Sequence, residues 1–323
     1  MVRTPGFHPG NRGSNPRGVT SRKLHFRNSA LPSILEVGRF SHLLNTSILS
    51  GLCYNLGMTT TGFEYKNKKN ETPFETFLRY TDEKKKSATK LATILEKKLS
   101  KATKVLDVGT GNGEYLDLAL SKVGANMSDN VELTLVEPSA DLVAQLENRF
   151  AKRFASANLK IIHSSLQDFK SDNSFDVILM SHLFYHLPRE FWTVELSKAL
   201  SVLKEEGVLI IVLREKDDAY DFKMAFKPLL FDASFRALTI DDVLAVLPKE
   251  PTLHVEKQLA SSELHIPIET DPEDTVSIIE FYLNKEWQDI PWRIQESSLE
   301  FIRKKNGVFK QVDGIAVVKR VCC

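Results

Sequence analysis

The sequence predicts a doubly wound α/β fold, with seven strands in a mostly parallel sheet and a helical cover on its N-terminal side. Two observations lead to this prediction. Short apolar segments alternate with amphipathic segments through residues 101–215, which is typical of a parallel sheet with right-handed crossovers. A glycine-rich stretch also lies between the first apolar segment and the amphipathic segment that follows it, at residues 109–113.

Apolar residues at helical spacing predict two helices before the sheet, near residues 73–80 and 83–99. Five buried strands follow, and helices separate most of them. The predicted strands are 104–109, 131–139, 159–165, 175–182 and 207–215, and the predicted helices are 113–123, 140–155 and 189–203. Parallel sheets of this kind bind ligands at the carboxyl ends of their strands, so functional loops are expected after Val108, Val136, His163 and Met180.

Beyond Glu215 the pattern predicts further helices and two closing strands. The predicted helices are 217–231, 239–249, 272–284 and 297–306, and the predicted strands are 253–266 and 314–321. Thr239 is expected to cap the second of these helices, because acids stand in the following turn. The two closing strands bring the sheet to seven.

Residues 1–57 do not fit a folded domain. They are rich in Gly, Pro, Ser, Asn and Arg and show neither a helical nor an alternating period, so they bury too little to offset ordering. The run Gly13-Ser14-Asn15-Pro16 matches the translation of the T-arm of a transfer-RNA gene. This favours a disordered or mis-annotated leader, with Met58 as the true start. An Arg-rich, acid-poor transit peptide is the alternative.

Charge and composition exclude several classes. Residues 1–57 hold seven of the 43 Lys and Arg residues but one of the 42 acids, so the remainder has a net charge of −5. A nucleic-acid partner is therefore disfavoured, because such binding needs a basic field. No apolar run reaches about 18 residues, so no membrane span is expected. The three cysteines, Cys53, Cys322 and Cys323, lack zinc spacing and suggest a reducing cytoplasmic compartment.

The glycine-rich stretch reads Gly109-Thr110-Gly111-Asn112-Gly113. Its third glycine comes one residue too early for the dinucleotide fingerprint, and no P-loop lysine follows. Asp107 and Glu114 flank the loop. Acids there oppose a pyrophosphate and suit a nucleoside that carries a sulfonium and an ammonium group. Glu137 ends the second strand, where a carboxylate can accept the hydroxyls of a ribose.

Three stretches, VLDVGTGNGEYL, LTLVEPS and FDVILMSHLFYHLP, resemble motifs of class I S-adenosylmethionine-dependent methyltransferases. The resemblance implies a Rossmann-like cofactor-binding core at 101–215, a helical cover at 58–100, and a C-terminal part, 216–323, that completes the sheet and the acceptor pocket. The implied cofactor site comprises Asp107, Gly109, Thr110, Gly111, Asn112, Gly113, Glu114, Glu137, Pro138, Ser165, Leu166 and Ser181.

Within that site, the resemblance implies a role for each side chain of note. Glu137 holds the ribose, and Asp107 and Glu114 line the amino-acid end of the cofactor. Ser165 and Leu166 fall where the family holds the adenine. Many members have an Asp in place of Ser165, and Asp168 is a nearby substitute.

A closer resemblance joins FLRYTDEKKKSATKLATILEKKL, VEPSADLVAQLENRF and LTIDDVLAVL, in that order, to the histamine N-methyltransferase family. It implies a monomeric enzyme that methylates a small-molecule acceptor, with Glu83 binding the acceptor amine. His182 takes the place of the family's polar residue after the fourth strand, and Tyr185 and His186 fall near its substrate-facing aromatic residues.

Other positions depart from that family. Leu142 replaces a Gln that touches the cofactor, and no Asn stands near Lys310 or Gln311, where the family has one that binds substrate. These differences favour the broader family over histamine itself.

Methyl transfer to an amine needs a group that removes a proton, and histidine suits this near neutral pH. The candidate catalytic residues are His182, His186, Tyr185 and Glu83. If their segment is α-helical, His182 and His186 share a face. The alternative is that His182 packs on the cofactor while His186 caps the next helix. No metal is expected, because Glu190 is the only nearby acid.

Three functions stay open on the sequence. The first is methylation of a small molecule, on an amine or imidazole nitrogen. The second is methylation of RNA or protein, which the acidic body and the SHLFYH stretch after the fourth strand disfavour. The third is a regulatory protein that binds the cofactor without catalysis, which the complete glycine loop and Glu137 disfavour.

Overall fold

The computed structural model describes residues 66, 69–101, 103–154, 158–172 and 174–321. The predicted leader, residues 1–57, and the start at Met58 lie outside these residues. Within the described part of the chain, no helix has the length and apolar character needed to cross a membrane.

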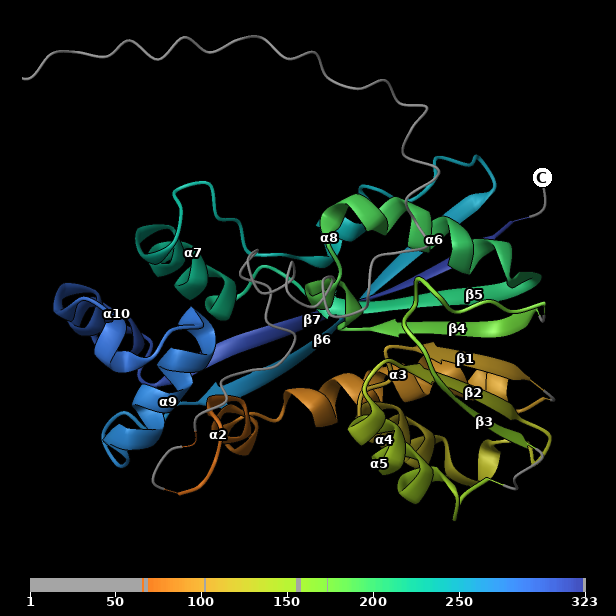
Figure 1. Cartoon of the computed structure of the whole chain (residues 1–323), viewed down its shortest axis with the longest axis horizontal. Coiled ribbons are helices and arrows are strands. Elements are labelled where there is room, and N and C mark those ends of the chain that lie inside the picture. Colours follow the sequence, from red (N-terminus) through yellow and green to blue (C-terminus); the bar gives the residue numbers. More distant parts are fainter. Residues whose placement is uncertain (1–65, 67–68, 102, 155–157, 173, 322–323) are drawn as a thin grey trace, which may run out of the picture. The chain divides into compact units, whose positions relative to one another are not determined.

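A seven-stranded sheet organises the fold, in the order β3-β2-β1-β4-β5-β7-β6 (Figure 1). The strands are β1 Lys104–Val108, β2 Glu132–Glu137, β3 Leu159–His163, β4 Phe175–Ser181, β5 Leu203–Arg214, β6 Leu253–His265 and β7 Val308–Arg320. The first five pair in parallel, whereas β7 runs antiparallel to both β5 and β6. The predicted fold class, a seven-stranded and mostly parallel Rossmann-like sheet, is confirmed.

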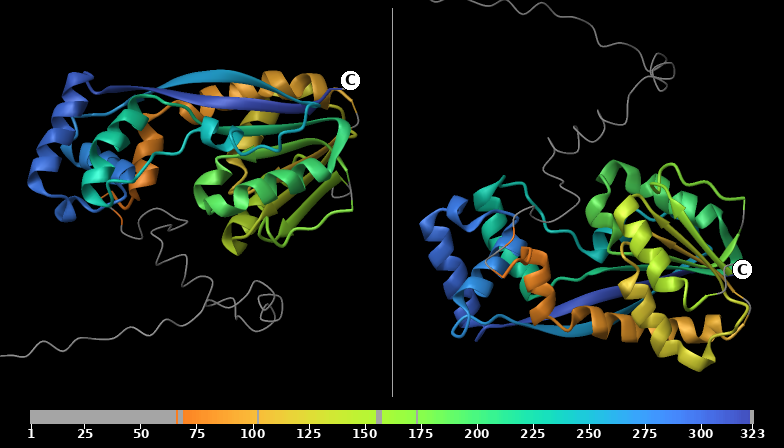
Figure 2. Two further views of the ribbon diagram at one scale, coloured as in Figure 1. Left: turned by 90° about the horizontal axis from the view of Figure 1, so that it is seen from above. Right: turned by 60° about the horizontal axis from the view of Figure 1, so that its bottom comes forward.

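Helices cover both faces of the sheet (Figures 1 and 2). One face packs on α3 Glu83–Leu99, α4 Glu114–Val123 and α5 Ala140–Phe150. The other packs on α6 Trp192–Ser201 and the short α8 Ile240–Leu244. Neighbouring strand residues serve opposite faces: Val105 joins the first core and Leu106 the second. This is why each central strand is apolar throughout.

The C-terminal half builds a third core beyond the sheet's parallel part. Strands β6 and β7 pair along their full 13 residues each and reach a group of helices (Figure 1). This group contains α2 Pro73–Tyr80, α7 Asp218–Leu230, α9 Pro272–Leu283 and α10 Trp292–Lys304. Its interior is aromatic, and it includes Phe77, Phe222, Phe226, Tyr282 and Phe309.

Many predicted boundaries lie close to the observed ones, but several differ. Helices α5 and α8 end at Phe150 and Leu244, before the predicted ends at 155 and 249. The predicted helix 189–203 is a 3₁₀ turn followed by α6, which ends at Ser201, and β5 begins already at Leu203. Helix α10 begins at Trp292, five residues before the prediction. Strand β7 begins at Val308 instead of Gly314, because its first half alternates buried and exposed residues and lacks a continuous apolar run.

We expect Phe222→Ala to lower the free energy of unfolding by about 3–5 kcal/mol, because it removes a fully buried ring and leaves a cavity. Phe231, just beyond the same helix, is 53% exposed, so Phe231→Ala is the matched control, with an expected loss below about 1 kcal/mol. Chemical denaturation of both variants measures the difference. Equal losses would show that Phe222 is not a core residue.

Candidate active site

The glycine loop joins β1 to α4, and all three glycines have positive φ: 68° at Gly109, 63° at Gly111 and 75° at Gly113. A Cβ at Gly109 would lie 2.6 Å from Leu183 Cδ1, and one at Gly113 would lie 2.5 Å from Phe150 Cε2. At Gly111 a Cβ would meet no atom within 4 Å. Packing inside the protein therefore requires the outer two glycines, while the middle one faces open space.

Glu137 ties this loop to the second strand. Its Oε2 accepts a hydrogen bond from the Gly111 N–H at 2.9 Å, and its Oε1 accepts one from the Ser139 N–H at 3.0 Å. The residue is 5% exposed. A carboxylate oxygen has two acceptor sites, so each oxygen keeps one for a ligand hydroxyl at the open side of Gly111.

Asp107 precedes the loop and is almost completely buried, with 3% exposure. Its Oδ1 has no hydrogen-bond partner among the described residues. Burial raises the pKa of Asp107 to about 7, and the Thr110 hydroxyl offsets only part of this effect, because an ionised carboxylate is costly in a buried place. A cationic ligand group beside Asp107 would restore the ionised form.

The other loop residues form local contacts. The Thr110 hydroxyl donates to the Asp107 carbonyl at 3.0 Å. Asn112 Oδ1 accepts from the Glu114 N–H at 3.1 Å, at the start of α4. The Glu114 carboxylate forms an ion pair with Lys84 Nζ at 2.5 Å, so its charge already has a partner from α3.

The remaining predicted cofactor residues follow β2, β3 and β4. The Pro138 carbonyl lies 2.9 Å from His163 Nε2. Ser165 Oγ donates to Asp168 Oδ2 at 2.7 Å, so the two candidates for the adenine amine bind each other. Leu166 is buried in the core, and Ser181 ends β4.

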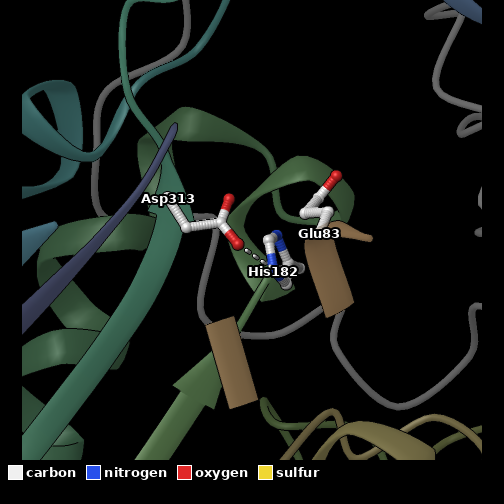
Figure 3. A group of neighbouring side chains, drawn as sticks. All are labelled: Glu83, His182 and Asp313. Carbon is white, nitrogen blue, oxygen red and sulfur yellow. Dashed lines mark ion pairs between the residues drawn. The ribbon is translucent and has the colours of Figure 1, made fainter. Parts of the chain in front are cut away.

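A second group of side chains converges beside the end of β4. Figure 3 shows Glu83 from α3, His182 from the loop after β4, and Asp313 from β7. One potential ligand atom of each residue lies within 4.8 Å of the others. His182 Nε2 lies 3.7 Å from Asp313 Oδ2, and Asp313 is fully buried.

The His182 backbone is in the left-handed region, with φ at 52°, which is uncommon for a residue other than glycine. Its N–H donates to the Val212 carbonyl at 2.9 Å. The imidazole lies between two tyrosines: the ring centroid of Tyr115 is 6.0 Å away, edge-on, and that of Tyr185 is 6.1 Å away, stacked. These contacts hold the imidazole toward Asp313.

Tyr185 and His186 lie in a 3₁₀ turn, Leu183–His186, instead of an α-helix. With three residues per turn, His182 stacks on Tyr185, and the α-helical face expected for His182 and His186 does not form. The Tyr185 hydroxyl accepts from the Arg214 N–H at 3.2 Å, and burial raises the pKa of Tyr185. Burial lowers the pKa of His186, which the Glu137 carboxylate partly offsets.

Sequence reasoning missed Arg214, which organises this second group. Arg214 Nη2 donates to Glu83 Oε2. Nη1 lies 3.4 Å from Asp217 Oδ2, and Nε lies 4.0 Å from Asp313 Oδ1. Three carboxylates thus gather around one buried guanidinium. Burial opposes ionisation of Glu83, but the Arg214 cation holds the pKa of Glu83 below its usual value.

Asp313 was also missed, and burial raises its pKa. The sequence contained a signal for each residue. Arg214 stands at the end of a predicted strand, where ligands bind, and Asp313 directly precedes the closing strand as it was predicted. The observed strand β7 begins at Val308, six residues before the predicted start, and so includes Asp313.

Glu83, His182 and Asp313 also match the kind of ligand set that holds a divalent cation. The sequence predicted no metal and considered only His182, His186 and Glu190. The structure brings a different trio together, and Arg214 already supplies a positive charge to it.

A known family model covers the central part of the chain. Residues 77–244 match the model of a family described as a methyltransferase domain, which spans just over half of the chain. The chain therefore belongs to the methyltransferase domain family. No curated protein matches the sequence.

Solved structures of methyltransferases are similar to the chain at low identity and with TM-scores below 0.5. A putative methyltransferase from Bacillus halodurans is 16% identical, covers 71% of this chain and 99% of its own, and has a TM-score of 0.47. A putative sarcosine dimethylglycine methyltransferase from Galdieria sulphuraria is 19% identical, with coverages of 72% and 85% and a TM-score of 0.45. The glycopeptide N-methyltransferase MtfA, solved with S-adenosylmethionine, is 18% identical, with coverages of 42% and 57% and a TM-score of 0.34.

The residues of the glycine loop fit S-adenosylmethionine, the cofactor that the sequence motifs imply. The middle glycine is open to a ligand, the Glu137 carboxylate retains free acceptor sites beside it, and Asp107 offers a buried oxygen without a partner. These features match, in turn, a nucleoside that approaches the backbone, a ribose diol and an ammonium group.

We expect Gly113→Ala to destabilise the protein by about 2–5 kcal/mol, since the new methyl group adds overlap with Leu146 and Phe150 to the cost of a positive φ. Gly111→Ala bears the backbone cost alone, about 1–2 kcal/mol. Denaturation without cofactor measures both variants. If Gly111→Ala is the more damaging change, then the packing role assigned to Gly113 is wrong.

Proposed function

We propose that this protein transfers the methyl group of S-adenosylmethionine to a basic nitrogen, an amine or imidazole, of a small-molecule acceptor. The observation that supports this most directly is the surplus of carboxylates at the acceptor side. Glu83, Asp217 and Asp313 outnumber the guanidinium they surround. A buried surplus of negative charge favours a cationic ligand.

On the cofactor side, we assign the ribose hydroxyls to Glu137 and the methionine ammonium to Asp107. Gly109, Gly111 and Gly113 shape the loop, Thr110 and Asn112 hold it by their hydrogen bonds, and Pro138, Ser165, Leu166 and Ser181 surround the nucleoside from the ends of the neighbouring strands. The cofactor supplies an electrophilic methyl group. The protein then needs chiefly to align the acceptor and exclude water.

On the acceptor side, we assign proton removal to His182. An ammonium or imidazolium acceptor cannot attack until it loses a proton, and an imidazole can accept it near neutral pH. Asp313 lies 3.7 Å from His182 Nε2 and stabilises the imidazolium that forms. Glu83 attracts the cationic acceptor, and Tyr185 covers the other face of the imidazole. His186 is the alternative base. The charge of Glu137 raises the pKa of His186 and so offsets part of the effect of burial.

This assignment agrees with the resemblance to the histamine N-methyltransferase family at Glu83. This residue begins α3 and lies beside His182 and Asp313. The pocket differs in other respects. Gln311 is fully buried and uses its amide on Thr81 and Tyr282, so it is not available to an acceptor. We therefore propose a relative of that family with another acceptor.

Cofactor affinity should depend on pH through Asp107. Its pKa is raised to about 7 by burial, so below pH 7 the carboxyl is neutral and loses its attraction for an ammonium group. Affinity for S-adenosylhomocysteine, measured by calorimetry, should rise from pH 5.5 to pH 7 and then level off. Asp107→Asn should bind weakly at every pH, without this rise. If the affinity of the wild type for S-adenosylhomocysteine stays constant from pH 5.5 to pH 8, the proposed pairing of Asp107 with the ammonium group is wrong.

An acceptor screen with labelled S-adenosylmethionine should place the label on small amines or imidazoles and leave bulk RNA unlabelled. With a working acceptor, Glu83→Gln should lower kcat/KM by about tenfold or more and spare cofactor affinity, because the charge that the acceptor and Arg214 lose lies outside the cofactor loop. Glu137→Gln is the matched variant on the other side and should weaken cofactor binding. Label found only in RNA, or unchanged acceptor kinetics for Glu83→Gln, would contradict the proposal.

A further inference from the structure

Among the described residues, two lysines on α7 form no ion pair, whereas other lysines near this helix do. Lys223 and Lys227 lie one helical turn apart and are both half-buried. Lys257 and Lys305 form ion pairs at 2.6 Å with Glu215 and at 2.7 Å with Asp218. Within the part of the chain that the structure describes, no carboxylate oxygen lies within 4.0 Å of Lys223 Nζ or Lys227 Nζ, so neither ammonium has an anionic partner.

Aromatic rings lie beneath both ammonium groups. Lys223 Nζ is 5.4 Å from the ring centroid of Tyr282. Lys227 Nζ is 5.2 Å from the ring of Phe235 and 6.0 Å from that of Phe231. Ring faces attract a cation, but they do not replace the water that burial removes. The rings therefore orient the two ammonium groups without neutralising them.

The surroundings are unfavourable for two unpaired cations. Burial lowers the pKa of Lys223 to about 7, and the positive charges of Lys227 and Arg214 lower this pKa as well. Burial also lowers the pKa of Lys227 to about 8. Asp217 and Glu83 offset only part of the effect on Lys223. An anion placed between the two lysines would relieve both the desolvation and the repulsion.

Helix α7 connects these lysines to the carboxylate group around Arg214. Asp217 caps α7 by accepting from the Tyr220 N–H at 2.8 Å, and the same side chain pairs with Arg214. Lys223 lies one turn beyond Tyr220. The charge of Arg214 lowers the pKa of Lys223, and the charge of Glu83 raises it. The two lysines therefore lie on the helix whose first turn is tied to the carboxylates around Arg214.

We propose that Lys223 and Lys227 form an anion subsite of the acceptor pocket, which binds a carboxylate or phosphate group of the molecule whose nitrogen is methylated. This inference rests on the proposed N-methyltransferase function and narrows its substrate class. The acceptor is an amine or imidazole that carries its own anionic group. Its cationic nitrogen faces the acids of the pocket, and its anion faces the two lysines.

Matched acceptor pairs test the inference in the full-length protein. Histamine and histidine, 2-phenylethylamine and phenylalanine, and ethanolamine and O-phosphoethanolamine differ by one anionic group within each pair. The first two pairs test a carboxylate, and the third tests a phosphate. We expect kcat/KM to favour the anionic member of at least one pair by about tenfold, as one added charge-assisted contact predicts.

Charge removal at the lysines should abolish that preference. Lys223→Met and Lys227→Met keep the aliphatic stem. Each should lower kcat/KM about tenfold for the acceptor that carries the anionic group, and should change the value for the paired amine without that group less than threefold. Lys216→Met is the matched control, because Lys216 is exposed just before α7 and lies 5.9 Å from the ring of Tyr220. It should behave like the wild type.

A binding measurement separates this inference from the proposed function. Inorganic phosphate, titrated at constant ionic strength into the complex with S-adenosylhomocysteine, should bind saturably to the wild type and to Lys216→Met but not to Lys223→Met. If phosphate binds in this way and none of the six amines is methylated, the anion subsite stands and the proposed acceptor chemistry fails. If amines without the anionic group are methylated as efficiently as those that carry it, or if Lys223→Met binds phosphate as the wild type does, the inference is wrong.

Discussion

The contact between Arg214 and Glu83 is the interaction on which the acceptor side depends. It joins the start of α3 to the end of β5, and the same guanidinium reaches Asp217 at the head of α7 and Asp313 on β7. Burying one guanidinium among three carboxylates is favourable only while all four groups are in place, because any one left alone would be an uncompensated buried charge. The cluster therefore joins four separate elements, α3, β5, α7 and β7.

The cofactor side rests on a different principle. Its parts come from neighbouring strands, and the hydrogen bond from the Gly111 N–H to Glu137 joins the first loop to the second strand. Parallel strands end at the same edge of the sheet, so residues that follow them meet without any long-range partner. The two sides face each other across the end of β4, where His182 is held in a strained backbone conformation. Strain of this kind, kept in place by surrounding contacts, is frequent at functional sites.

Prediction from sequence succeeded where the signal is local. Apolar runs located the parallel strands, and the charged stretch around Asp82 proved to be the boundary between α2 and α3. It was weaker where a strand is half exposed. The first half of β7 alternates buried and exposed residues, so its sequence lacks the continuous apolar run of a central strand. The same weakness hid Asp313, which lies in that half. The 3₁₀ turn after β4 was also beyond prediction, because its conformation depends on the bond from His182 N–H to Val212 and on its packing.

The sequence by itself determined the fold class, the glycine loop and the acid that faces it, since these depend on periodicity and on residues within one βαβ unit. It also indicated Glu83 and His182 as candidates through resemblance. Only the tertiary structure decided what surrounds them. Glu83 and Arg214 are 131 residues apart in the chain, and His182 meets Asp313 across a similar separation. Such pairs leave no local pattern, because their geometry arises only when β7 inserts between β5 and β6.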